Sequence, residues 1–189
     1  MMVQSSSWRQ PNNRPGAKAA PTHRPVEIST EQGQGRQRRI LASVEIPRPV
    51  EQVWHVLTDY EHLADFIPNL ARSRQLPHPH GGIRLEQLGT QCFLSIKFCA
   101  RVVLDMRELF PQELRFSMVE GDFKEFWGAW RLHPLSQADG TGTRLDYELM
   151  VLPLATMPIP LIEQHLCRNL RQNLLAICDR TLVCFDPPS

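Results

Sequence analysis

Hydrophobic and polar positions divide the chain into segments with a period of two and segments with a period near 3.6. The alternation over residues 40–46 predicts a first strand, which ends at Pro47. Apolar residues at 50, 53, 54 and 57 follow the i, i+3, i+4, i+7 spacing of one helical face. A second short helix is expected between Tyr60 and Ile67, where Pro68 ends it.

The middle of the chain has the pattern of an antiparallel sheet. Strands are expected at residues 70–76, 83–88, 114–118, 126–132 and 145–151, joined by short links. The clearest pattern is FLSIKFCARVVLDMR, residues 93–107, in which apolar residues from Leu94 to Met106 occupy every second position. A straight strand of that length would exceed ~40 Å at a rise of ~3.3 Å per residue. We therefore expect it to bend strongly or to break near Lys97.

The last ordered segment has helical spacing. Residues 162, 166, 170, 174 and 177 place apolar side chains on one face of a helix that runs from Ile159 to about Val183. A sheet with one apolar face must be covered, and this helix is the only element large enough to cover it. The sequence therefore predicts an α+β domain: a curved antiparallel β-sheet wrapped around a long C-terminal α-helix, with two short helices after the first strand.

Charge separates a tail from this domain. Residues 1–40 hold seven Lys and Arg against two Glu, a net +5, and the remaining residues have a net −4. Low hydrophobicity and four prolines in the first 26 residues predict a disordered basic tail over 1–37, followed by the domain over 38–185. The same residues lack acids and contain Ser and Arg, so import into an organelle through residues 1–26 stays open.

Several function classes receive no support from the residues. The five cysteines include no CxxC pair, which favours buried thiols in a reducing compartment such as the cytoplasm. No apolar run reaches the ~20 residues of a membrane span. His78 and His80 lie in a Gly- and Pro-rich loop without further ligands, so no metal site is predicted. No nucleotide or cofactor motif occurs, and no cofactor is predicted.

Three strings resemble a known family. VEIPRPVEQVWHVLTDYEHLADFIPNL (44–70), VEGDFKEFWGAWRLHPL (119–135) and NLLAI (173–177) are similar to the START-like, or helix-grip, superfamily. More narrowly, they resemble its polyketide cyclase/dehydrase and coenzyme Q-binding protein group, and the resemblance covers about residues 38–183. It implies a deep apolar cavity between the sheet and the terminal helix, with the two short helices at its mouth. Ligands across that superfamily are lipids, sterols, polyketides and prenylated quinones.

Candidate ligand-binding residues follow from the inward parity of the strands, the apolar side of the helix and the implied mouth. Trp130 is preferred over Trp127 because it shares parity with Phe126 and Leu132. Asn169 and Asn173 fall on the apolar side of the helix, where their amides either hold a ligand oxygen or bond to neighbouring backbone. The full set is Phe66, Phe98, Val102, Phe116, Trp130, Tyr147, Leu149, His165, Leu166, Asn169 and Asn173.

Three functions remain open at this point. The first is a carrier or chaperone for a hydrophobic small molecule, such as a lipid or a prenylated quinone. The second is an aromatase/cyclase or dehydratase, with Tyr147 and His165 as the best acid–base candidates and no catalytic residue assigned. The third is a ribosome- or RNA-associated regulator, which the acidic body disfavours. Transient contact with a membrane surface is also considered, through the apolar, Pro-rich segment 151–162 and the basic tail.

Overall fold

A computed structural model describes residues 25–93, 96–137 and 140–185, without the side chains of residues 91–98 and 137–140. In chain order the elements are β1 (Glu27–Gln32), β2 (Arg38–Ile46), α1 (Val50–Thr58), α2 (Leu63–Phe66), β3 (Leu70–Leu76), β4 (Ile83–Phe93), β5 (Ile96–Leu109), β6 (Glu113–Gly121), β7 (Glu125–Gln137), β8 (Gly140–Leu152) and α3 (Ile159–Phe185).

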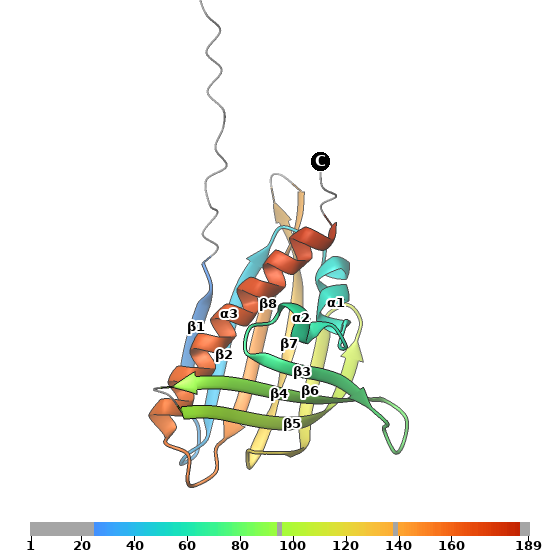
Figure 1. Cartoon of the computed structure of the whole chain (residues 1–189). Coiled ribbons are helices and arrows are strands. Elements are labelled where there is room, and N and C mark those ends of the chain that lie inside the picture. The colour runs from blue at the N-terminus through green and yellow to red at the C-terminus, as the bar shows by residue number, and fades with distance from the viewer. Residues whose placement is uncertain (1–24, 94–95, 138–139, 186–189) are drawn as a thin grey trace, which may run out of the picture.

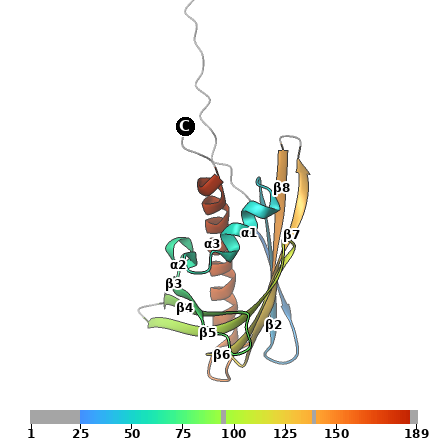
Figure 2. The ribbon, with the colours of Figure 1, turned by 90° about the vertical axis from the view of Figure 1, so that its right-hand side faces the viewer.

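The strands form one antiparallel sheet that curls around α3. Its order is β1-β2-β8-β7-β6-β5-β4-β3, so β1 and β3 are the two edges. Figures 1 and 2 show α3 lying along the concave face, with α1 and α2 beside it. Leu174 and Ile177 of α3 are fully buried with Ile40 and Leu145 of the sheet. The expected α+β helix-grip architecture is confirmed.

The curvature of the sheet has identifiable local causes. The pairing of β5 with β6 shifts register between Val103 and Leu104, and the pairing of β3 with β4 shifts between Leu70 and Arg72. An extra residue in one strand of a pair bends the sheet and increases its twist. As a result β3, β4 and β5 turn across the lower part of α3 instead of continuing the plane of β7 and β8 (Figure 2).

The structure divides the segment 93–107 between two strands, and the break lies close to Lys97, where a bend or a break was expected. The chain turns back between Phe93, the last residue of β4, and Ile96, the first of β5, and these two residues pair across the hairpin. Leu94 belongs to the two connecting residues, which lie outside the described part. The alternating pattern concealed the turn because Leu94 continues it and no Gly, Asn or Pro marks it. β4 also runs through Gly89 to Phe93 instead of ending at Leu88.

The structure also finds a strand within the segment expected to be a tail. β1 pairs with β2 from Glu27↔Ser43 to Gln32↔Arg38. Arg36, in the turn between them, donates from Nη2 to the carbonyl oxygens of Leu154 (3.0 Å) and Met157 (2.5 Å). The hairpin thereby holds the segment that leads into α3. β1 escaped sequence analysis because its side chains are mostly polar and exposed, as is common at a sheet edge.

The convex face of the sheet carries ion pairs. Glu148 accepts from Arg39 and Arg131 at 2.8 Å each, and Glu86 accepts from Arg74 at 2.6 Å and Arg101 at 2.8 Å. A charged outer face and an apolar inner face explain the period-two pattern of the strands. Within the described residues, no helix has the length and hydropathy of a membrane span, and no three metal-ligating side chains gather.

Candidate functional site

A cavity of about 220 Å³ lies between the concave face of the sheet and α3. The α1–α2 segment and the start of β3 close one side of it. The sheet lines it mainly with apolar side chains, so the concave face is not completely filled by α3. Its lining residues are Ile40, Leu57, Tyr60, Leu63, Ile67, Pro68, Asn69, Leu70, Leu85, Gln87, Gly89, Leu104, Met106, Leu114, Phe116, Phe126, Trp130, Tyr147, Leu149, Leu166, Asn169, Leu170, Asn173 and Ile177.

An aromatic cluster forms the sheet side of this cavity. Trp130 of β7 and Tyr147 of β8 are register partners, and their ring centroids lie 4.3 Å apart. The Phe116 ring stacks on Tyr147 at 5.8 Å and 15°, and Phe126 lies 5.8 Å from Phe116. Neighbouring strands place these side chains on one face because alternate residues of a strand point the same way. A planar or branched apolar ligand would find a continuous aromatic wall here.

Room for the cluster depends on Gly128, which precedes Trp130 by two residues on the same strand face. A Cβ atom at this position would lie 1.9 Å from the Glu148 carbonyl oxygen and 2.7 Å from Cζ of Phe116. No side chain can be accommodated at such distances without backbone movement. Gly128 therefore permits the close packing of β7, β8 and the Phe116 ring.

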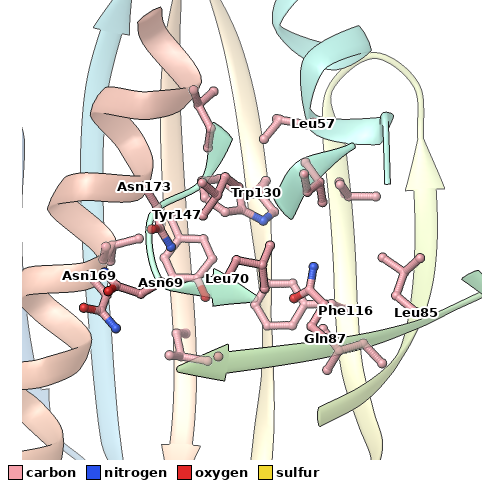
Figure 3. A pocket seen from close by; sticks show the side chains of 18 of the residues that line it. Leu57, Asn69, Leu70, Leu85, Gln87, Phe116, Trp130, Tyr147, Asn169 and Asn173 are labelled. Carbon is pink, nitrogen blue, oxygen red and sulfur yellow. The ribbon is translucent and has the colours of Figure 1, made fainter. Parts of the chain in front are cut away.

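α3 contributes the opposite wall, and this wall contains amides. Asn169 and Asn173 are one turn apart on α3 and face the sheet (Figure 3), and Leu166 and Leu170 line the same wall. Oδ1 of Asn173 is buried and has no hydrogen-bond partner among the described residues. Asn169, in contrast, makes an interaction of its own. An unpartnered buried acceptor costs about 1–3 kcal/mol, so Asn173 is the least satisfied polar group on this wall.

Two further polar groups belong to the aromatic wall. Among the described residues, neither the Tyr147 hydroxyl nor the Trp130 indole N–H makes a hydrogen bond. Burial raises the pKa of Tyr147 above its ordinary value, because the phenolate would lose its hydration. Tyr147 is therefore a neutral hydroxyl at physiological pH and can both donate and accept.

A second compartment of about 170 Å³ adjoins the first. It lies between the N-terminal half of α3 and strands β4, β5 and β7, and it shares Leu70, Gln87 and Leu166 with the first compartment. Val102 and His165 line it. Small-molecule sites usually measure about 300–1,000 Å³, a size that neither compartment reaches by itself. The shared lining residues place the two compartments side by side.

The rim is held by side-chain contacts from α2 and the loop that follows it. The Tyr60 hydroxyl donates to Glu108 Oε1 at 2.6 Å, and burial together with this carboxylate raises the pKa of Tyr60. Nδ2 of Asn69 donates to Oε1 of Gln172 on α3 at 3.1 Å. The Arg180 guanidinium lies 5.6 Å from the centre of the Phe66 ring. The Tyr60 contact joins the rim to β5, and the Asn69 and Phe66 contacts join it to α3.

Acid–base groups are scarce in this space. The described residues that line the first compartment include no Asp, Glu, Lys, Arg or His. In the second compartment, burial and then the nearby Arg168 charge lower the pKa of His165, which keeps its imidazole neutral at pH 7. The arrangement can bind and orient an apolar molecule, and its proton-transfer groups are Tyr147 and His165.

The structure brings most of the predicted ligand-binding residues together. The first compartment contains Phe116, Trp130, Tyr147, Leu149, Leu166, Asn169 and Asn173, and the second contains Val102 and His165. Trp130 faces the cavity, whereas Trp127 is 46% exposed on the outer face. Phe66 lines neither compartment, because its ring packs under Arg180. The side chain of Phe98 lies outside the described part of the structure.

Sequence analysis missed Gln87 and Asn69. Gln87 lines both compartments and points into the cavity in Figure 3. Gln87 is two residues from the buried Leu85 on the same strand, which indicated that its side chain faces inward. Polar residues in a short strand are, however, usually assigned to the solvent-exposed face. Asn69 adopts a positive φ of 64°, which asparagine tolerates better than most residues. Asn69 is the last residue of the short link between α2 and β3.

Comparison with known proteins agrees with this geometry. A family model described as "Polyketide cyclase / dehydrase and lipid transport" matches residues 46–178. Solved structures of similar fold include a STAR-related lipid transfer protein from Xanthomonas axonopodis, with a TM-score of 0.64, 15% identity, and coverage of 82% of this chain and 93% of that one. A START superfamily protein from Mycobacterium smegmatis has a TM-score of 0.61 at 15% identity, covering 76% and 96%.

An aromatase/cyclase and two toxins are also similar. The Zhui aromatase/cyclase from Streptomyces sp. R1128 has a TM-score of 0.62 at 17% identity, covering 77% of this chain and 93% of that one. The "Persistence and stress-resistance toxin PasT" of Escherichia coli O6:H1 is 28% identical over 104 residues, and the "Ribosome association toxin RatA" of E. coli K12 is 26% identical over 104 residues. Each match covers 55% of this chain and 61% of the relative.

Proposed function

The chain belongs to the polyketide cyclase/dehydrase and lipid-transport family of the START-like superfamily, and from this premise we propose that it binds a hydrophobic small molecule and carries or protects it. The ligand occupies the space between the concave sheet and α3. Hydrophobic ligand binding is what this fold supports at the level of the family.

One observation carries the proposal: the cavity is lined by aromatic and aliphatic side chains and is not filled by α3. Protein interiors normally pack to a density of about 0.74, so an unfilled apolar space costs dispersion contacts that a guest can restore. The adjoining second compartment provides further room for an extended apolar tail. A carrier needs this combination of apolar lining and available volume.

A non-catalytic role agrees with the composition of the site. The first compartment has no ionisable carboxyl, amine or imidazole group among its described lining residues. General acid–base catalysis requires a group with a pKa near the working pH within reach of the substrate. Burial raises the pKa of Tyr147, so its hydroxyl stays protonated at neutral pH and the phenolate is not available as a general base.

Recovery of a guest from the purified protein tests the proposal. Native mass spectrometry should detect a bound apolar molecule that organic extraction releases. Replacing Leu166 by Trp places a large ring where the two compartments meet and should abolish guest retention. Val183→Trp adds the same side chain at a 71% exposed position of α3 and should retain the guest. Guest retention by Leu166→Trp would place the molecule elsewhere and end the cavity-carrier proposal.

A second candidate is an aromatase/cyclase- or dehydratase-type reaction, which the buried Tyr147 hydroxyl favours. In this case the identified guest should be converted during incubation, and Tyr147→Phe should stop the conversion while binding persists. An unchanged guest after incubation with the wild-type protein would leave the carrier function alone.

A third candidate is association with ribosomes, which the names of the curated relatives bring forward. The sheet's outer face offers little free positive charge where arginines such as Arg39, Arg101 and Arg131 already bind carboxylates. We therefore expect no co-sedimentation with ribosomes at low salt, where phosphate contacts are strongest. Co-sedimentation that disappears as salt is raised would replace the carrier proposal with this one.

Membrane contact is part of the carrier proposal. Leu154 is 36% exposed in the Pro-rich segment before α3, while Arg36 fixes that segment through its backbone. Flotation with anionic vesicles should recover the wild-type protein in larger amount than Leu154→Ser. Equal recovery of the two proteins would remove this segment from the proposal.

A further inference from the structure

The composition of the first compartment restricts the charge that a ligand there can carry. The described residues that line the first compartment include no charged side chain. A carboxylate or phosphate placed there would lose its hydration without gaining a counter-charge, which is among the most costly changes in a protein interior. If the proposed carrier function holds, the part of the ligand that enters this compartment is uncharged.

Three hydrogen-bonding groups in the same compartment are unused. They are Oδ1 of Asn173, the hydroxyl of Tyr147 and the indole N–H of Trp130, and none has a partner among the described residues. Oδ1 only accepts, the indole N–H only donates, and the hydroxyl does either. Small-molecule sites commonly combine an apolar lining with a few polar groups that fix orientation.

These groups lie on facing walls of the cavity. Trp130 and Tyr147 are adjacent across the β7–β8 ladder, with ring centroids 4.3 Å apart. Asn173 reaches toward them from α3, and Figure 3 shows all three side chains around the same space. One ligand group between the walls is therefore the simplest partner for all three.

We propose that the ligand is an uncharged alcohol or phenol whose hydroxyl group lies between Asn173, Tyr147 and Trp130. A hydroxyl oxygen can accept two hydrogen bonds and its proton can be donated once. It accepts from Tyr147 and Trp130 and donates to Oδ1 of Asn173, which satisfies the three groups together. A ketone or quinone oxygen accepts the same two bonds and leaves Asn173 without a donor.

Four probes with one bicyclic skeleton test this assignment: tetralin, 1-tetralone, 1-tetralol and tetralin-1-carboxylate. Each is titrated into guest-free protein by calorimetry at pH 7.5. We expect 1-tetralol to bind about tenfold more tightly than 1-tetralone, since the ketone leaves one buried acceptor unpaired. Tetralin should bind more weakly than the ketone, and the carboxylate should show no binding at the concentrations used.

Variants assign the preference to individual residues. Asn173→Leu should give the alcohol and the ketone equal affinity, whereas Tyr147→Phe should weaken both. Gln164→Leu changes an exposed side chain on the same helix and should leave the order of the probes unchanged.

Three results overturn the assignment in different ways. Equal binding of tetralin, the ketone and the alcohol by the wild-type protein would refute the hydroxyl site and leave the carrier function standing. No binding of any probe, together with the absence of a guest in the purified protein, would refute the carrier function and the hydroxyl site together. Preference for the alcohol that survives in Asn173→Leu would refute the role of Asn173.

Discussion

Asn173→Leu should make the ligand-free protein more stable while it weakens ligand discrimination. The buried Oδ1 of Asn173 has no partner among the described residues, and such a group costs about 1–3 kcal/mol. Leucine has a similar size, removes that cost, and places apolar atoms beside Leu170 and Ile177. Leucine is also the better helix former, by less than ~0.7 kcal/mol. The expected gain in the free energy of unfolding is about 1–3 kcal/mol.

Urea denaturation of guest-free protein, followed by circular dichroism, measures this gain. The guest-free state of each sample is first checked by native mass spectrometry, because a bound guest stabilises the folded wild type. Asn169→Leu is the matched control: it is the same substitution one turn earlier, at an amide that already makes an interaction. It should be neutral or destabilising, so the difference between the two variants isolates the unpartnered amide.

The reasoning fails if Asn173→Leu is no more stable than the wild type. That result would mean that the Asn173 amide is satisfied in solution, by water inside the cavity for example. A gain of the same size in Asn169→Leu would also refute it, because helix propensity and apolar contact would then explain the whole effect. Either outcome removes the basis for placing a ligand hydroxyl against Asn173.

Gly128→Ala should destabilise the fold by about 3 kcal/mol in the same urea assay, because its Cβ would meet the Glu148 carbonyl oxygen at 1.9 Å; Gly89→Ala, whose nearest contact would be 3.7 Å, should change little, and equal effects would contradict this. Arg131 and Arg39 hold the pKa of Glu148 below its ordinary value, and Arg115 and Arg131 do so for Glu113. Their stabilisation is complete above the unfolded pKa of ~4.3 and is lost as pH falls through the folded values, so the urea midpoint should drop between pH 5 and pH 3; a constant midpoint would count against these pairs. Of the two tryptophans in β7, Trp127 is 46% exposed, so Trp127→Phe should remove most of the acrylamide quenching that this pair contributes. Trp130→Phe should remove the fluorescence response to a cavity guest. The opposite pattern would mean that Trp127 faces the cavity and Trp130 faces solvent.

The sequence predicted the architecture because its signals were local and repeated. Alternation identified β2, β3 and β6 closely and the central parts of β7 and β8, which extend about five residues further toward their shared hairpin. The spacing of Ile162, Leu170 and Ile177 identified the face of α3 that is buried. Strand β1 and the position of the hairpin between Phe93 and Ile96 were not predicted, for the opposite reason. Leu94 continues the alternating pattern of its neighbours in the sequence, and β1 has mostly exposed polar side chains.

The sequence predicted which side chains face the candidate site, but it did not predict whether a cavity exists there. Parity placed Trp130 and Tyr147 on the inner side, but no pattern reveals whether facing side chains meet or leave a space. Phe66 illustrates the limit: its position in α2 suggested that it lines the cavity, whereas its ring packs under Arg180, more than a hundred residues later. Such pairings depend on how α2 and α3 approach one another, which residue order alone does not determine.

The sheet has two edges, β1 and β3, and this determines where elements of the fold can separate. β2 and β3 are separated in the chain only by the two short helices, yet they lie far apart in the strand order, with β3 at an edge. Along the seam between α2 and α3, the described contacts are a single amide hydrogen bond and a cation–ring contact. Parting this seam would break no interstrand hydrogen bonds. Under the carrier proposal, this seam is where a guest would enter and leave, while the eight-stranded sheet stays intact.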